Sequence, residues 1–234
     1  MKRILIVISL LVSGLANGQT AEEYVSKGDV EYALQDYRGA IAYYNKAIEL
    51  NPNNTLAFLS RGLGKARLED HRGAIADFTK AIELNSNVAA AYYNRGCAKG
   101  RLEDYRGAID DFSKAIELKP NFAEAYYERG IAKEKLEDYG GAIADFTQTI
   151  ELSPNDSYAY YERGLAKFKL EDPRGAIADF TQTIELNPFI VTAYYNRGLM
   201  YIILGQIDEG CMDLSKAGEL GHYKAYDMIK KYCN

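Results

Sequence analysis

Apolar residues recur along the chain at the spacing of amphipathic helices. In residues 139–152, Ile143, Phe146 and Ile150 follow one another at helical spacing with polar residues between them. The preceding stretch, residues 123–136, has the same character. This periodicity predicts two helices, each with one buried face. The two stretches are therefore expected to form one helix pair.

The paired pattern returns with a fixed period. The motif YRGAI at 37–41 reappears as HRGAI, YRGAI, YGGAI and PRGAI, each copy 34 residues after the last. In this frame the chain divides into repeats one to six, at residues 21–54, 55–88, 89–122, 123–156, 157–190 and 191–224. Such a period indicates a solenoid, in which stacked repeats cover one another's apolar faces. The fold class predicted is all-α.

Asp and Pro mark the borders of the second helix of each repeat. An Asp precedes this helix in the first five repeats: Asp36, Asp70, Asp104, Asp138 and Asp172. Its carboxylate can accept the free N–H groups of the first turn and suits the helix dipole. Pro173 directly follows Asp172, at the position where a helix favours proline. The glycine of the motif, as at Gly39, is expected to mark a close approach of backbone.

The spacing of small residues resembles the tetratricopeptide-repeat family over residues 21–224. That family has small residues at the eighth, twentieth and twenty-seventh positions and often proline at the thirty-second. The eighth position here holds Gly28, Gly62, Gly96, Gly130, Gly164 and Gly198. The twentieth holds Ala40, Ala74, Ala108, Ala142, Ala176 and Gly210. Ser86 and His222 occupy the thirty-second position where the family often has proline. The resemblance implies a right-handed superhelical solenoid of antiparallel helix pairs.

The two ends of the chain differ from the repeats. Lys2 and Arg3 precede an apolar stretch that ends in small residues, which predicts a signal peptide at 1–18, cleaved before Gln19. We therefore expect export, to the bacterial periplasm or medium, and no membrane insertion after cleavage. Residues 225–234 are expected to form a helix that caps repeat six, with Ala225, Met228, Ile229 and Tyr232 on its packed face.

The three cysteines are expected to have different roles. Cys211 occupies the place that Ile177 has in repeat five, a position that faces the next element along the solenoid. For repeat six that element is the cap, which carries Cys233. We expect a disulfide between Cys211 and Cys233, the alternative being two buried thiols in contact. Cys97 is left unpaired, as a small side chain lining the groove.

Arginine and aspartate also recur together in repeats two to six. The seventh position holds Arg61, Arg95, Arg129, Arg163 and Arg197, and the twenty-third holds Asp77, Asp111, Asp145, Asp179 and Asp213. Repeat one lacks both and has Lys27 and Tyr43 instead. The joint change indicates an Arg–Asp pair between the helices. The alternative is arginine bonded to backbone carbonyls or water.

The resemblance places a partner-binding groove on the first helices. Its fifth positions are Leu59, Tyr93, Tyr127, Tyr161 and Tyr195, its sixth are Ser60, Asn94, Glu128, Glu162 and Asn196, and its ninth include Cys97 and Ile131. Tyrosine rings beside polar groups can bind a peptide. Packing on neighbouring repeats is the alternative role for the rings. The Lys, Asn and Arg clamp with which co-chaperone members grip a carboxylate is absent, and Glu128 and Glu162 disfavour an anionic ligand.

Charge and composition exclude several classes of function. Without Lys2 and Arg3 the chain has 26 basic and 33 acidic residues, a net charge near −7, and no basic stripe. Nucleic acid and anionic membranes are therefore unfavourable partners. Two His and three dispersed Cys lack the spacing of a metal site, and no phosphate-binding loop occurs. The carboxylates recur in every repeat, so they indicate helix caps and solvated faces rather than a catalytic pair.

These patterns together predict a non-enzymatic protein–protein interaction scaffold without a cofactor. Its partner would be a protein or peptide held in the concave groove. The alternative is a carbohydrate-binding scaffold at the cell envelope, in which the groove tyrosines stack on sugars.

Overall fold

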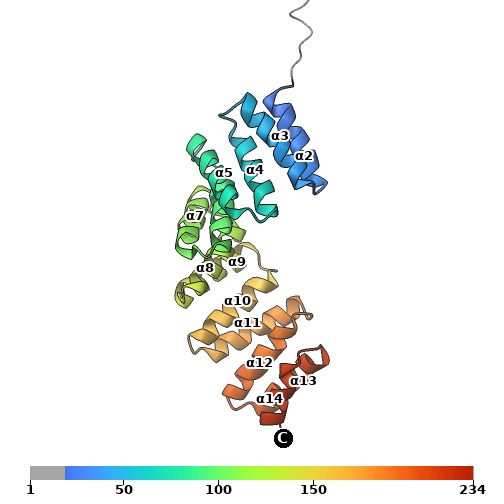
Figure 1. Ribbon diagram of the computed structural model, residues 1–234. Coiled ribbons are helices and arrows are strands. Elements are labelled where there is room, and N and C mark those ends of the chain that lie inside the picture. The colour runs from blue at the N-terminus through green and yellow to red at the C-terminus, as the bar shows by residue number, and fades with distance from the viewer. Residues whose placement is uncertain (1–18, 234) are drawn as a thin grey trace, which may run out of the picture. The chain divides into compact units, whose positions relative to one another are not determined.

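The computed structural model describes residues 19–233, and every regular element in that part of the chain is a helix (Figure 1). The predicted signal peptide, residues 1–18, lies outside the described residues. The first helices of the six repeats are α2 (Ala21–Ala33), α4 (Thr55–Arg67), α6 (Ala89–Arg101), α8 (Ala123–Lys135), α10 (Ser157–Lys169) and α12 (Val191–Ile203). The second helices are α3 (Tyr37–Leu50), α5 (His71–Leu84), α7 (Tyr105–Leu118), α9 (Tyr139–Leu152), α11 (Pro173–Leu186) and α13 (Ile207–Glu219). A further helix, α14 (Lys224–Tyr232), follows them.

The described residues divide into two compact parts, one that ends at residue 87 and one that begins at residue 88. In the first part, α2 packs on α3, α3 on α4 and α4 on α5. In the second part, each helix from α6 to α14 packs on the next one along the chain. Both parts are therefore built as tandem helix pairs joined by short turns, which is the predicted all-α solenoid arrangement.

The turn inside each pair ends one helix and caps the next. Between α8 and α9, Glu137 has a left-handed backbone with φ 63°. The next amide, Asp138 N–H, donates to the Lys133 carbonyl at 2.9 Å, which closes the end of α8. The Asp138 carboxylate accepts the Gly141 N–H at 2.9 Å and so caps α9. All five predicted Asp caps are confirmed in the same geometry.

The glycine of the repeated motif makes room for this cap. A Cβ atom on Gly39 would lie 2.5 Å from Oδ2 of Asp36, and the capping Asp is likewise the nearest neighbour at Gly73, Gly107, Gly141 and Gly175. The expectation of a close backbone approach was therefore wrong. The group that comes close is the capping carboxylate, and a Cβ at this position would displace it.

In repeats one to five the eighth-position glycine faces a ring from the second helix of the same repeat, whereas Gly198 of repeat six faces the Gly210 carbonyl and Leu214. Phe78, Phe112, Phe146 and Phe180 are at most 2% exposed, and Tyr44 takes their place in repeat one. A Cβ atom on Gly130 would lie 2.7 Å from Cε1 of Phe146. Only glycine therefore lets the paired helices enclose an aromatic ring between them.

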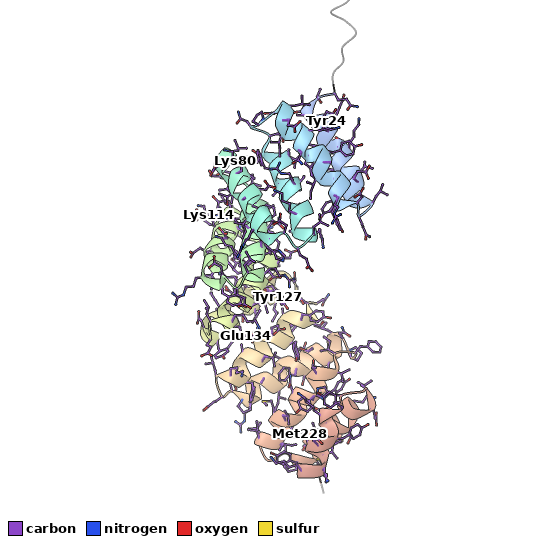
Figure 2. The ribbon with its side chains drawn as sticks, in the orientation of Figure 1. Tyr24, Lys80, Lys114, Tyr127, Glu134 and Met228 are labelled. Atoms are coloured by element: carbon purple, nitrogen blue, oxygen red, sulfur yellow. A yellow bond between two sulfur atoms is a disulfide. The ribbon has the colours of Figure 1, made fainter. Side chains whose placement is uncertain are left out.

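Helix α14 covers the end of repeat six. Ala225 is buried, and Met228 and Ile229 pack with it against Leu214 and Ala217 of α13 (Met228 is labelled in Figure 2). Tyr232 was expected on this face but is 37% exposed. Cys233 packs against the cluster instead of Tyr232.

A disulfide bond links the cap to the last repeat. It joins Cys211 of α13 to Cys233 directly after α14, with a Cα–Cα distance of 5.8 Å. The sequence separation of 22 residues makes the closed loop short. The bond therefore restrains α14 without tying together distant parts of the chain.

Candidate functional site

Arginine–aspartate pairs fix the orientation of each first helix from repeat two onward. In repeat four, Arg129 donates from Nε and Nη2 to the two carboxylate oxygens of Asp145, at 2.9 and 2.6 Å. Lys133 Nζ lies 2.7 Å from the same carboxylate. Asp145 is only 2% exposed, so these bonds compensate the burial of its charge. Equivalent two-bond pairs occur at Arg61–Asp77, Arg95–Asp111, Arg163–Asp179 and Arg197–Asp213, which confirms the predicted pairing.

Arginines of this set also reach the preceding repeat. Arg129 Nη1 donates to Ser113 Oγ at 3.0 Å, and Arg163 Nη1 donates to Thr147 Oγ1 at 3.1 Å. The Arg129 guanidinium lies 5.5 Å from the centroid of the Tyr126 ring, close enough for a cation–π contact. These arginines therefore bond within their own repeat and between repeats. Their role is structural, and they hold the groove tyrosines on successive first helices in register.

The groove tyrosines pack partly into the core. The rings of Tyr93, Tyr127 and Tyr161 lie 5.9, 5.7 and 5.7 Å from the second-helix rings Phe112, Phe146 and Phe180. All three tyrosines remain partly exposed. Burial raises the pKa of each of these hydroxyls above its ordinary value, so they stay protonated donors at neutral pH. Packing and an accessible groove face are therefore both present at these positions.

Three other predicted groove residues are engaged elsewhere. Tyr195 stacks on His222 with ring centroids 4.2 Å apart and packs with the cap. Asn196 Nδ2 donates to the Tyr161 hydroxyl at 3.1 Å. Asn94 Nδ2 donates to the Ala90 carbonyl of its own helix at 2.7 Å. The structure therefore does not bring these three side chains into the cavities described next, and Tyr161 and Glu162 do not line those cavities either.

Two cavities adjoin at Tyr127 and Glu128 on α8. The larger, about 430 Å³, is lined by Cys97, Gly100, Arg101, Tyr105, Phe112, Ile131, Ala132 and Lys135 as well as these two residues. The smaller, about 190 Å³, is lined by Tyr93, Ala123, Glu124, Thr149, Ser153 and Asp156 as well as the same two. Tyr127 and Glu128 therefore form a shared wall, and the two cavities make one site within residues 88–234.

Partly buried carboxylates give this face its charge. Glu128 and Glu134 lie on α8, and Glu162 lies on α10 (Tyr127 and Glu134 are labelled in Figure 2). Burial raises the pKa of Glu128, although the Arg101 charge opposes the change. Burial, reinforced by the nearby Glu134, raises the pKa of Glu162 to about 7, against an opposing effect of Lys135.

Glu128 and Glu162 have no fixed partner. In residues 19–233, neither carboxylate makes a hydrogen bond or an ion pair within 4.0 Å, in contrast to the doubly paired Asp145. Both are only partly exposed. Glu128 is therefore an incompletely solvated acceptor that a ligand could satisfy, and Glu162 is an acceptor when ionised.

Cys97 and the potential metal ligands bear on catalysis and metal binding in the part of the chain that the structure describes. Burial raises the pKa of the Cys97 thiol to about 12, so the reactive thiolate is disfavoured at neutral pH. Within residues 19–233 no group of three or more His, Cys, Asp or Glu side chains is placed to hold a metal ion. In the same range, no helix has the length and apolar character needed to cross a membrane.

Some of the site residues were predictable from the sequence and some were not. Tyr93, Tyr127, Glu128, Cys97 and Ile131 were identified from their positions in the repeat. The basic residues Arg101 and Lys135 were missed, and so were the second-helix residues Tyr105 and Thr149, and Ser153 directly after α9. The basic residues could have been found from their spacing. Arg101 lies 27 residues before Glu128, and Lys135 lies 27 residues before Glu162.

Comparison with known sequences identifies the repeats. Residues 89–122, 123–156 and 161–210 match families described as tetratricopeptide repeat, and residues 28–70 match one described as TPR repeat. Together these ranges take in most of the described chain. No curated protein shows a significant match.

Solved structures with the same architecture include proteins of similar length. YrrB, described as a TPR protein with an unusual peptide-binding site, is 27% identical with a TM-score of 0.72, over 80% of this chain and 97% of that one. MamA is 29% identical with a TM-score of 0.69, over 73% of this chain and 93% of that one. PilF of Pseudomonas aeruginosa is 14% identical with a TM-score of 0.75, over 90% and 97% of the two chains, and supports the fold alone. The helix pairs, their glycine and alanine contacts and these matches together show that the chain belongs to the tetratricopeptide-repeat family.

Proposed function

We propose that the protein is a non-enzymatic interaction scaffold that binds a segment of a partner protein across α6, α8 and the residue that caps the start of α10. The observation that carries this proposal is the pair of adjoining cavities that share Tyr127 and Glu128. Two neighbouring side chains of one segment could enter them together. The peptide-binding site named for YrrB, a structure of the same fold, supports the proposal.

The energetics of this site suit a peptide. Partly exposed tyrosines contribute apolar contact area at low entropic cost, and their hydroxyls orient a backbone. The Arg–Asp pairs hold successive first helices in place before binding, so little ordering of the scaffold is needed. Unpaired carboxylates on the same face gain partners only when a ligand arrives.

Selection from a random peptide library on immobilised residues 19–234 tests this function. We expect enriched peptides whose binding is lost in a Tyr127→Ala/Tyr161→Ala variant. Because these rings also pack in the core, an Ile131→Trp variant that fills the larger cavity should give the same loss. Asp110→Asn, an exposed change on α7, is the control. Circular dichroism verifies folding, and enrichment that persists in both groove variants would place the binding elsewhere.

Carbohydrate binding at the same tyrosines is less well supported. A sugar stacks on an open ring face, whereas Tyr93 lies against both Phe112 and Phe122, with centroids 5.9 and 4.8 Å away. A glycan array provides the test. Binding to glycans that is lost in Tyr127→Ala would favour the carbohydrate alternative over the peptide.

We propose that the protein acts after export, in the periplasm or the medium. The basic start and apolar stretch of residues 1–18 support this, and the Cys211–Cys233 bond is consistent with an oxidising compartment. The chain recovered from the periplasm or medium should begin at Gln19. Mass spectrometry that finds an intact Met1 on that material would refute the proposed cleavage.

A further inference from the structure

The groove differs in charge between its two cavities. The charged residues that line the smaller cavity are Glu124, Glu128 and Asp156, all acidic. The larger cavity has Glu128 on the shared wall and the basic residues Arg101 and Lys135. An incoming segment therefore meets a uniformly acidic cavity beside a mixed one.

Resting on the function proposed above, we infer that the partner segment is basic, with a lysine or arginine side chain in the smaller cavity and an adjacent apolar side chain in the larger one.

The carboxylates of the smaller cavity retain capacity to accept hydrogen bonds. Asp156 uses Oδ1 to accept the Tyr158 and Ala159 amides at 3.0 and 3.2 Å, which leaves its second oxygen. Glu128 has no hydrogen bond or ion pair in the part of the chain that the structure describes. Burial raises the pKa of Glu128, which indicates poor solvation of its charge. Arg101 acts on this charge only from beyond 4.0 Å, so a cation placed here would supply a directly bonded counter-charge.

Four nearby cations of the scaffold make contacts with other residues. Arg129 and Lys133 both bind the buried Asp145. Lys99 binds Asp111 at 2.7 Å. Lys119 Nζ lies 4.4 Å from the centroid of the Phe122 ring, in a cation–π contact. These side chains cannot neutralise Glu124 or Glu128 without giving up their present contacts. Arg101, which lines the larger cavity with Glu128, partly offsets the Glu128 charge, so the acidic character of the smaller cavity depends on Glu124 and Asp156 as well.

The size and aromatic walls of the smaller cavity also suit a long cationic side chain. Its volume is about 190 Å³. Pockets for drug-sized molecules begin at roughly 300 Å³, so this cavity has room for one side chain rather than a larger ligand. Tyr93 and Tyr127 border it, and aromatic faces attract a cation carried on an apolar stem. Thr149 and Ser153 line it as well and add oxygen acceptors, whereas an acidic side chain would face three carboxylates.

The larger cavity suits an apolar neighbour. Its walls include Cys97, Phe112, Ile131 and Ala132, of which Phe112 and Ala132 belong to one buried cluster that Cys97 packs against. Its charged groups, Glu128, Arg101 and Lys135, are of both signs and attract no single charge. Because Tyr127 and Glu128 border both cavities, the basic and apolar side chains must be close together in the partner.

The library selection on residues 19–234 tests this inference through the amino-acid composition of the enriched peptides. We expect enriched peptides to contain Lys or Arg next to an apolar residue and to be depleted in Asp and Glu. An enriched peptide should bind a Glu128→Gln/Glu124→Gln variant roughly tenfold or more weakly, by fluorescence anisotropy. Replacing the basic residue of that peptide by glutamine should weaken its binding to the wild type by the same factor. The glutamine-substituted peptide should bind the Glu128→Gln/Glu124→Gln variant about as weakly as it binds the wild type.

The outcomes separate this inference from the proposed function. Asp110→Asn removes one exposed negative charge outside the groove and should leave affinity within about twofold, since such a charge is screened. Enriched peptides that lack basic residues, or that bind the Glu128→Gln/Glu124→Gln variant equally well, would overturn the basic partner while leaving the groove function intact. Absence of any peptide that distinguishes wild type from Ile131→Trp would overturn both.

Discussion

Replacing Arg129 by leucine removes the two-bond partner of a buried carboxylate in repeat four. Asp145 is 2% exposed and keeps Lys133 at 2.7 Å after the change. Removing one partner of a buried pair costs about 3–5 kcal/mol when the other charge is left uncompensated. The Arg129 side chain is already 18% exposed. Because of that exposure and because Lys133 remains, we expect a loss of about 2–4 kcal/mol.

The double variant Arg129→Leu/Asp145→Leu distinguishes a lost ion pair from lost packing. Removing both charges eliminates the uncompensated carboxylate, so the double variant should be more stable than Arg129→Leu alone. The sum of the single effects should exceed the effect of the double variant by about 2 kcal/mol or more. Lys114→Leu is the control, because its ion pair with Glu117 is exposed (Lys114 is labelled in Figure 2). Exposed pairs of this kind contribute about 0–1 kcal/mol.

Two measurements report the effect. Urea unfolding gives the free energy of unfolding of the whole chain. Hydrogen exchange of the α8 and α9 amides gives local stability, which matters because a repeat array can open one region at a time. A structural role for the pair is refuted if Arg129→Leu costs no more than Lys114→Leu, or if the single effects simply add in the double variant.

Three further substitutions test other features. Gly130→Ala would bring its Cβ to 2.7 Å from Phe146 Cε1, whereas Gly100→Ala meets no heavy atom within 4 Å. The first should therefore lower the melting temperature through an overpacking cost of about 1–3 kcal/mol, and the second should not. Glu137 has a φ of 63°, which strains a non-glycine residue. Glu137→Gly should therefore raise the free energy of unfolding by up to about 1 kcal/mol, and unchanged urea unfolding would count against that strain. Glu162→Gln should stabilise the chain at pH 8, by about 1–2 kcal/mol after discounting for solvent, and much less at pH 4. The sign follows from a pKa raised from 4.5 to about 7, because the folded wild type binds the extra proton and loses stability as pH rises through that window. A stability difference independent of pH would contradict it.

The secondary structure could be predicted from the sequence because the residues that determine it act locally. The capping Asp, the proline at the start of α11 and the apolar period all act within a few residues, and the structure has the helices there. The Arg–Asp pairs could also be predicted from the sequence, for a related reason. Their partners stay 16 residues apart in every repeat that has them, and repeat one lacks both. Repetition thus made a tertiary contact visible as a pattern.

The glycines show what could not be predicted from the sequence. Sequence alone located Gly39 and Gly130 as positions where a side chain is disfavoured. It did not determine that Gly39 makes room for a capping carboxylate or that Gly130 makes room for a phenylalanine ring. These neighbours depend on backbone angles in the turn and on the ring positions between the helices.

The sequence by itself determined the repeat, the order of helices and the residue types that recur on the groove face. Only the tertiary structure decided which of those residues meet. Tyr127 and Glu128 border two cavities, whereas Tyr195 stacks on His222 near the cap. The physical reason is that a cavity and the pKa of a carboxylate depend on distances and burial among side chains from several repeats, which no periodic pattern within one repeat records.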